Sequence, residues 1–299
     1  YYYRLGTWDD FDDGAGEFSN PQLSGAGTFT TGLPKGSNQS FKVMACGDSR
    51  DDEGQLASNA TWLKDLDVDF WLFSGDMTGM GTQSQWNTWF NSLAPVMIRK
   101  VIMPVQGNHE LLANAYYSQF ALPLNGPSNL LEHTWSFDYG NVHFVGLDSM
   151  TTAIVQDQKS WLHQDLSAAS QDADIDWIVV MFHHPAYSAS NHGSTDRVQD
   201  HWVPIFEQYG VDLTIAGHDH NYERTVPILD GNENESGVVH VTAGGFFAPG
   251  YSNGNEWWTA VSAHGNQSNY LILEFDGTTL HATAYNGSQN VLDEFTLTK

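Results

Sequence analysis

The sequence predicts an α/β fold in which a largely buried sheet packs against a second, mostly antiparallel sheet. Five short apolar runs between residues 41 and 216 have the length and the β-branched or aromatic content of strands. Segments with helical spacing separate these runs, which is typical of βαβ units. Further strand-like runs follow from residue 240, with Asp276-Gly277 and Asn286-Gly287 as turn signals.

The five predicted strands share one feature: each ends abruptly in a polar turn. The runs are 41–46, 68–74, 101–105, 177–182 and 211–216. The turns that follow them are Gly47-Asp48, Gly75-Asp76, Gly107-Asn108, His183-His184 and Gly217-His218-Asp219-His220. Because open α/β sheets carry their sites at the carboxyl ends of the strands, these turns predict one shared site.

The remaining elements follow from periodicity and turn residues. Helices are predicted around 56–66, 86–93, 161–166 and 202–209, where apolar residues recur at helical spacing. Strands are predicted at 240–243, 270–275, 280–285 and 291–297. Residues 1–40 are rich in Gly, Ser, Thr and Asp, and they predict an appendage with short strands at 1–4 and 27–31 around a loop.

Composition and charge restrict the possible functions. The chain has 299 residues, 40% of them hydrophobic, so it can bury a core and is not expected to be disordered. Its 36 acidic and 11 basic residues give a net charge of −25, which repels nucleic acid and anionic membranes, so neither is expected as a partner. Cys46 is the one cysteine and is expected to be buried, and an internal disulfide is excluded. No run is long enough to span a membrane, and residues 1–4 do not predict a signal peptide.

Six polar side chains at the strand ends form a candidate metal site: Asp48, Asp76, Asn108, His183, His218 and His220. Carboxylates and imidazoles are ligands for Zn, Mn or Fe, and an amide carbonyl adds a neutral oxygen. An aspartate can bridge two cations, and two metals about 3.5–4 Å apart can activate a water and hold phosphate oxygens. One Gly-Asp pair usually marks only a turn or a helix N-cap, whereas five such strand ends in order indicate a site.

These turns, together with Gly107-Asn108-His109-Glu110 and His183-x-Pro185, resemble the calcineurin-like metallophosphoesterase superfamily. Residues 217–225 are similar to purple acid phosphatases and their bacterial relatives. The resemblance implies a four-layer α/β/β/α sandwich with two mixed sheets over residues 41–299, and a remnant of a preceding fibronectin-like domain and linker over residues 1–40. It also implies secretion, or a periplasmic or cell-envelope location. Oligomeric state stays open.

The implied activity is metal-dependent hydrolysis of phosphate monoesters, by in-line attack of a metal-activated hydroxide on the phosphorus of a small-molecule ester. Alternatives of the same fold are a phosphodiesterase, a nucleotide-directed phosphatase, or a module that binds metal or phosphate without turnover. A carbohydrate-binding or adhesion role for the 11 tryptophans is a further alternative. Most of these tryptophans fall at helical spacing or within strands, which favours a core role.

Carried over from the resemblance, one cation is expected on Asp48, Asp76 and His220. The other is expected on Asp76, Asn108, His183 and His218, with Asp76 as the bridge. His184 is expected to pack behind the ligands. His109 and His192 are expected to contact the phosphate or to assist the leaving group.

Two positions depart from the family pattern. Arg50 stands where the broad superfamily has a histidine, and Gly79 stands where the purple subgroup has a tyrosine ligand. The first cation is therefore expected to bind weakly, with Mg or Ca as candidates there, and the purple colour is expected to be absent. We hypothesise that the Arg50 guanidinium replaces part of the missing charge by holding a phosphate oxygen. The alternative is an ion pair of Arg50 with Asp51, Asp52 or Glu53.

A Gly-rich segment over residues 244–269 carries five aromatic residues: Phe246, Phe247, Tyr251, Trp257 and Trp258. The segment either forms an aromatic rim that stacks on a substrate ring, or folds on itself by burying these rings.

Overall fold

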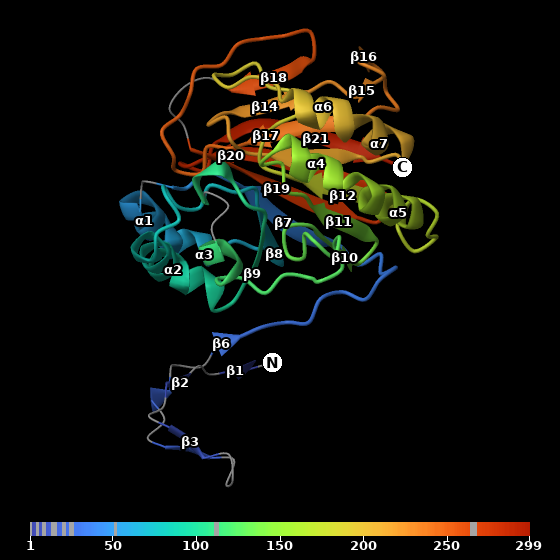
Figure 1. Ribbon diagram of the computed structural model, residues 1–299. Helices are drawn as coiled ribbons and strands as arrows, with labels where there is room; N and C mark the ends of the chain where they lie inside the picture. The colour runs from blue at the N-terminus through green and yellow to red at the C-terminus, as the bar shows by residue number, and fades with distance from the viewer. Residues whose placement is uncertain are drawn as a thin grey trace.

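Two mixed β-sheets face each other in the computed structural model, and helices cover their outer sides (Figure 1). The structure describes residues 27–50, 53–110, 114–263 and 268–299, together with short strands within residues 2–23. One sheet has six strands in the order β21-β20-β19-β7-β8-β9, and the other has seven in the order β10-β11-β12-β13-β17-β14-β18. The predicted four-layer α/β/β/α sandwich is confirmed.

The six-stranded sheet carries the first three strand ends of the candidate site. Its parallel strands are β7 (Phe41–Cys46), β8 (Phe70–Phe73) and β9 (Val101–Pro104). The antiparallel strands β19 (Asn269–Asp276), β20 (Thr279–Asn286) and β21 (Val291–Thr298) complete it. The expectation of a separate, mostly antiparallel sheet is therefore wrong, because β19 pairs with β7. The helices α1 (Glu53–Leu63), α2 (Gln83–Met97) and α3 (Asn114–Tyr117) lie beside this sheet (Figure 1). A capping box of Thr82 and Gln85 fixes the start of α2.

The seven-stranded sheet carries the other strand ends. Its strands are β10 (Trp135–Tyr139), β11 (Val142–Gly146), β12 (Trp177–Met181), β13 (Leu213–Ala216), β14 (Tyr222–Thr225), β17 (Val239–Ala243) and β18 (Thr259–Ala263). The outer side is covered by α4 (Thr152–Asp157), α5 (Lys159–Ala169), α6 (Asp196–His201) and α7 (Val203–Gln208) (Figure 1).

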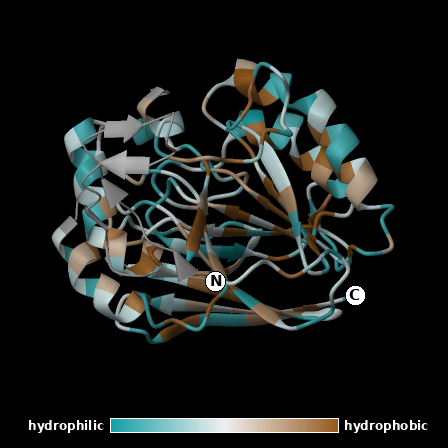
Figure 2. Ribbon diagram, turned by 90° about the horizontal axis from the view of Figure 1, so that it is seen from below, coloured by the Kyte–Doolittle hydropathy of each residue, from teal (hydrophilic) through white to brown (hydrophobic). Residues whose placement is uncertain are grey.

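Strand alternation divides the buried side chains between two cores. In β12, Trp177, Val179 and Met181 point into the core between the sheets, while Ile178 and Val180 point into the core under α4–α7. Figure 2 shows hydrophobic segments in the central strands, and alternating hydrophobic and hydrophilic segments along the helices. Fully buried tryptophans, which favour the core interpretation of these residues, are Trp71, Trp86, Trp89, Trp135, Trp177 and Trp202. Cys46 is a buried free thiol, as predicted.

Some elements differ from the sequence predictions. The hairpin β10–β11 and strand β14 were not predicted, and β18 lies inside the Gly-rich segment 244–269, where no strand was predicted. Two small hairpin strands, β15 (Ile228–Leu229) and β16 (Asn232–Glu233), connect β14 to β17. In the described part of the chain, no helix has the length and apolar character to cross a membrane.

Of the predicted N-terminal strands, the one at 27–31 is shorter than expected, and residues 1 and 4 of the other lie outside the described residues. Strand β1 (Tyr2–Tyr3) pairs antiparallel with β6 (Gly27–Thr28). Between them, β2 (Gly6–Thr7) pairs with β5 (Gln22–Leu23), and β3 (Asp10–Asp12) pairs with β4 (Glu17–Ser19). Paired strands therefore occupy the region that was predicted as a loop. The division of the chain at residue 40 stays a prediction.

Candidate metal centre

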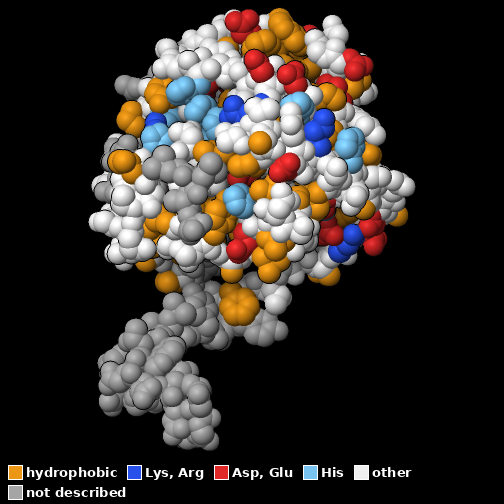
Figure 3. Space-filling model, viewed as in Figure 1, with side chains coloured by type: hydrophobic (Ala, Val, Ile, Leu, Met, Phe, Trp, Pro, Cys, Tyr) orange, Lys and Arg blue, Asp and Glu red, His pale blue; other side chains and the backbone are white. Residues whose placement is uncertain are grey.

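The polar turns from both sheets meet and hydrogen-bond to one another. The Asp48 backbone N–H donates to the Gly75 carbonyl at 2.9 Å, which joins the turns after β7 and β8. The His218 backbone N–H donates to the Asp48 carboxylate at 2.9 Å, which joins the two sheets across 170 residues of chain. Figure 3 shows histidine and basic side chains gathered in a band across one face of the molecule. The expected convergence of the strand ends is therefore present.

Three of these residues have a left-handed backbone, which is uncommon for residues other than glycine. The φ angles of Asp48, Asp76 and His218 are 62°, 55° and 70°. Such conformations cost energy and persist at sites where the surroundings hold them. Here the hydrogen bonds of their own backbone N–H groups hold them, and these left-handed turns direct the side chains toward the other strand ends.

The atoms around His183 leave a position that attracts positive charge. His183 Nδ1 lies 2.7 Å from the Ser74 carbonyl oxygen, so Nδ1 donates a proton there. Its Nε2 lies 3.0 Å from Asn108 Oδ1 and 3.4 Å from Asp76 Oδ1. Both oxygens are acceptors, so either a proton on Nε2 or a metal ion must supply the charge that these three atoms share.

The electrostatics of this group agree with that requirement. Burial favours the neutral ring, but the charges of Asp76 and Asp48 raise the pKa of His183 to about 9. Burial also favours the neutral acid of Asp76, but His183 and the His109 backbone N–H hold the pKa of Asp76 below its usual range. Burial and the charge of His183 lower the pKa of His218 to about 2, so His218 stays neutral, the form that ligates metals.

His218 completes the donor set of this group. Its Nδ1 is buried with no hydrogen-bond partner among the described residues. A buried ring nitrogen without a partner is costly unless a ligand satisfies it. Two groups of three residues have potential ligand atoms that all lie within 4.8 Å of one another. One group is Asp48, Asp76 and His183, and the other is His183, His184 and His218. The donors present therefore fit Zn, Mn or Fe.

The group around His220 differs because a basic side chain lies in it. Asp48 Oδ1 is 3.4 Å from His220 Nε2 and is buried without a hydrogen-bond partner among the described residues. Burial raises the pKa of Asp48. The Arg50 guanidinium lies 2.7 Å from His220 Nε2 and donates to the Tyr251 hydroxyl at 3.0 Å. The alternative partners Asp51 and Asp52 lie outside the described residues, as does the side chain of Glu53.

The two predicted substrate histidines lie at different exposures beside the ligands. The His109 backbone N–H donates to Asp76 Oδ1 at 2.8 Å, and its Nε2 contacts Arg50 Nη1. His192 is exposed, and its ring centroid is 4.2 Å from that of His218. The Asp219 carboxylate holds the His192 backbone N–H at 2.9 Å. Both histidines therefore line the same centre, and their roles stay predictions.

His184 lies against the ligands and hydrogen-bonds away from them. Its Nδ1 is 2.9 Å from Ser149 Oγ, and its ring centroid is 4.4 Å from that of His218. The expected packing role of His184 agrees with this contact, although its position also allows it to ligate.

Glu110 is the residue whose role the sequence did not predict. Its carboxylate is fully buried and accepts four backbone N–H groups at 2.9–3.1 Å, from Asp76, Met77, Thr78 and Gly107. It thereby joins the turn after β8 to the turn after β9. An acidic residue directly after a strand-end Asn-His pair is the only sequence signal for it, and that signal does not say where the carboxylate points.

The aromatic segment divides between the two alternatives that the sequence left open. Phe246 and Phe247 are buried in the core, whereas Trp257 is 52% exposed. Tyr251 stacks on the His220 ring at 4.1 Å between centroids, with an interplanar angle of 7°. No sequence signal separates Tyr251 from the other rings of this segment.

Comparison with known proteins agrees with this geometry. The family model of calcineurin-like phosphoesterases matches residues 41–222. The chain belongs to this family. Within this calcineurin-like phosphoesterase, the matched region contains every candidate metal ligand, from Asp48 to His220.

The relatives of this phosphoesterase include purple acid phosphatases, which confirms that resemblance. Purple acid phosphatase 18 of Arabidopsis thaliana is 30% identical over 185 residues, which are 58% of this chain and 42% of that protein. An uncharacterized protein of Mycobacterium tuberculosis is 33% identical over 165 residues, which are 48% of this chain and 31% of that protein. The chain thus spans less than half the length of these curated relatives.

A solved structure shares the fold. Purple acid phosphatase PPD1 from yellow lupin seeds superimposes with a TM-score of 0.77 at 21% identity, over 94% of this chain and 57% of that chain.

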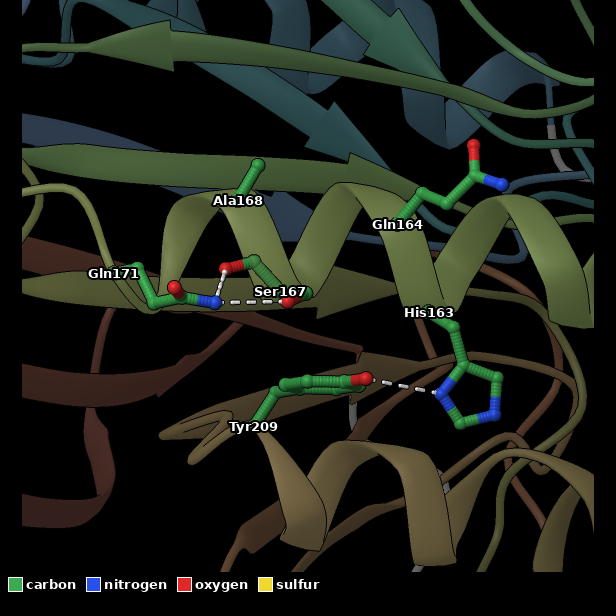
Figure 4. Close-up of a pocket in the computed structure, with 6 residues that line it drawn as sticks. All are labelled: His163, Gln164, Ser167, Ala168, Gln171 and Tyr209. Atoms are coloured by element: carbon green, nitrogen blue, oxygen red, sulfur yellow. Dashed lines mark hydrogen bonds between the residues drawn. The ribbon is translucent and has the colours of Figure 1, made fainter.

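A hollow on the outer helical layer is unrelated to this centre. It has a volume of about 530 Å³ between α5 and the end of α7, and it is lined by His163, Gln164, Ser167, Ala168, Gln171 and Tyr209 (Figure 4). One hydrogen bond of 3.3 Å joins His163 and the Tyr209 hydroxyl there, and no carboxylate lines it. It therefore lacks the donor set that the strand ends provide.

Proposed function

We propose that this chain is a metal-dependent hydrolase of phosphate esters, with phosphate monoesters of small molecules as substrates. The observation that carries the proposal is the arrangement of Asp76, Asn108 and His183. Asn108 Oδ1 lies 3.0 Å from His183 Nε2, and Asp76 Oδ1 lies 3.4 Å from the same nitrogen. Membership of the calcineurin-like phosphoesterase family supports the reaction class.

The residues that would hold a metal ion follow from the two groups. Asp76, Asn108, His183 and His218 would hold one cation, and Asp48, Asp76 and His220 would offer a second, weaker position. When bound there, a divalent ion such as Zn, Mn or Fe lowers the pKa of water and neutralises phosphate charge. The strongly negative chain depends on such local positive charge to attract an anionic substrate.

The other residues would bind and orient the phosphate. The exposed His192 ring beside His218 can donate a hydrogen bond to a phosphate or leaving-group oxygen when it is protonated. His109 lies next to Asp76 and would contact the same phosphate. Arg50 between His109 and His220 would add a fixed positive charge. A location outside the cytoplasm, by secretion or in the cell envelope, stays a prediction of the resemblance.

Phosphate release by the purified chain tests the proposal. The metal-free chain is expected to be inactive on p-nitrophenyl phosphate and to gain activity on addition of Mn²⁺ or Zn²⁺. Asn108→Ala is expected to lower that activity by at least about 10- to 100-fold. Removing even a residue that only hydrogen-bonds to a metal ligand typically lowers metal affinity or activity by that factor. Asn129→Ala is the matched control, since Asn129 is exposed and bonds only to Asp157 among the described residues.

Two further measurements separate the alternatives. If p-nitrophenol is released faster from bis-p-nitrophenyl phosphate than from the monoester, the chain is a phosphodiesterase rather than a monoesterase. Tight binding of metal and inorganic phosphate without turnover of either ester would contradict hydrolysis and leave a binding module.

A further inference from the structure

We propose that the Arg50 guanidinium takes the place of the first cation, so that this centre binds one metal ion per chain and carries its second positive charge as a side chain. The inference rests on the proposed function only in that it needs a metal ion at Asp76, Asn108, His183 and His218. It departs from the two-metal arrangement that the family resemblance implies.

The first step is to locate the ring protons of two histidines, His220 and His109. His220 Nδ1 is 2.6 Å from the Pro249 carbonyl oxygen, which can only accept, so the ring proton lies on Nδ1. His109 Nδ1 is likewise 2.6 Å from the Gly79 carbonyl oxygen. Each ring therefore presents the lone pair of Nε2, the form that would bind a metal, toward the interior of the centre.

The Arg50 guanidinium already satisfies both lone pairs. Its Nη2 lies 2.7 Å from His220 Nε2, and its Nη1 contacts His109 Nε2. A guanidinium stays protonated and can only donate, so both contacts are hydrogen bonds from arginine to imidazole. A cation on His220 Nε2 would have to displace this charged group and remain beside it.

The surroundings hold the guanidinium in this position. Nη2 donates to the Tyr251 hydroxyl at 3.0 Å, and the Tyr251 ring is stacked on His220. The Tyr251 backbone N–H donates to the His220 carbonyl at 2.9 Å, and the Arg50 backbone N–H donates to the Asp76 carbonyl at 3.1 Å. Arg50 is thus tied by its backbone to the metal ligand Asp76, and by its side chain to three rings.

The group around His183 has no comparable donor. Among the described residues, no Lys or Arg forms a hydrogen bond or ion pair with Asn108, His183 or His218. The positive charge of that group comes from a proton on His183 Nε2 or from a metal ion, whereas the group around His220 already contains a guanidinium. Arg50 Nε–H is buried without a partner in the described part of the chain.

Metal stoichiometry tests the inference independently of activity. The metal-free chain is loaded with excess Mn²⁺, dialysed, and measured by elemental analysis and by electron paramagnetic resonance. The wild type is expected to hold about one ion with the spectrum of isolated Mn²⁺, because only one group has free ligands. Arg50→His is expected to hold about two, with the spin coupling of ions about 3.5–4 Å apart, because it removes the guanidinium and adds a ligand.

Two control variants make the result specific. Arg99→His adds a histidine at an exposed position and is expected to stay at about one ion. Arg50→Gly removes the charge without adding a ligand, and it is expected to bind a second ion more weakly than Arg50→His. It also provides the test if Arg50→His does not fold, as judged by circular dichroism.

The outcomes distinguish this inference from the proposed function. A wild type that binds two coupled ions overturns the inference, even if it hydrolyses esters. A folded Arg50→His that stays at one ion also overturns it. A wild type with one ion and no turnover contradicts the proposed function and leaves the assignment of Arg50 intact.

Discussion

Replacing Glu110 by glutamine tests how strongly one buried carboxylate holds the strand ends together. The carboxylate accepts four backbone N–H groups, two on each oxygen. A glutamine has the same shape but only one acceptor oxygen, so its amide N–H₂ would face two donors. A buried donor left without a partner costs about 1–3 kcal/mol, so two of them predict a loss of about 2–6 kcal/mol in the free energy of unfolding.

Urea unfolding of the metal-free chain, followed by tryptophan fluorescence, measures this loss. Burial and the charge of Asp76 raise the pKa of Glu110 to about 7, so the measurement is made at about pH 8 or above, where the carboxylate is ionised. Metal affinity is expected to fall as well, by about 10- to 100-fold, because Glu110 holds the Asp76 backbone N–H. The control is Glu235→Gln, at an exposed position. A Glu110→Gln protein within about 1 kcal/mol of the wild type would refute the reasoning.

Two further perturbations act on other parts of the structure. His143 donates to Asp138 at 2.6 Å and to Asp165 at 2.9 Å; burial opposes its charge, but these carboxylates raise the pKa of His143 to about 9. The charged ring therefore contributes about 3 kcal/mol below about pH 6.5, and this contribution disappears as pH rises through about 9. His143→Gln should lose that amount at low pH and little at high pH in urea unfolding, and a deficit independent of pH would contradict the ion pairs. Gly107→Ala should lower the free energy of unfolding by about 3 kcal/mol or more, because the added Cβ meets the backbone N and the carboxylate of Asp76. Thermal unfolding measures it, with Gly277→Ala as a control in open space at a positive φ, and equal losses at the two positions would reject the steric argument.

The sequence pattern alone determined where most strands lie, whereas the four layers followed from the family resemblance and the division of the strands between two mixed sheets was not predicted. Runs such as 177–182 alternate between the two cores once folded, and they could be predicted because strand period and apolar content are local properties. The ligand types could also be predicted, since each ends a strand and strand ends of such sheets share an edge. The hairpin β10–β11 and strand β18 were missed because their assignment depends on pairing with distant strands rather than on local pattern.

Only the tertiary structure decided which side chains lie against each of the two ligand groups. The direction of each side chain depends on left-handed turns at Asp48, Asp76 and His218, which no local pattern specifies for these residue types. Arg50 hydrogen-bonds to His220, which lies 170 residues further along the chain, and the same guanidinium donates to the hydroxyl of Tyr251, which lies in a third segment. A guanidinium and a metal ion both bind the lone pair of a histidine nitrogen. Which of the two a given histidine binds depends on the three-dimensional positions of the side chains, and these cannot be read from the order of residues alone.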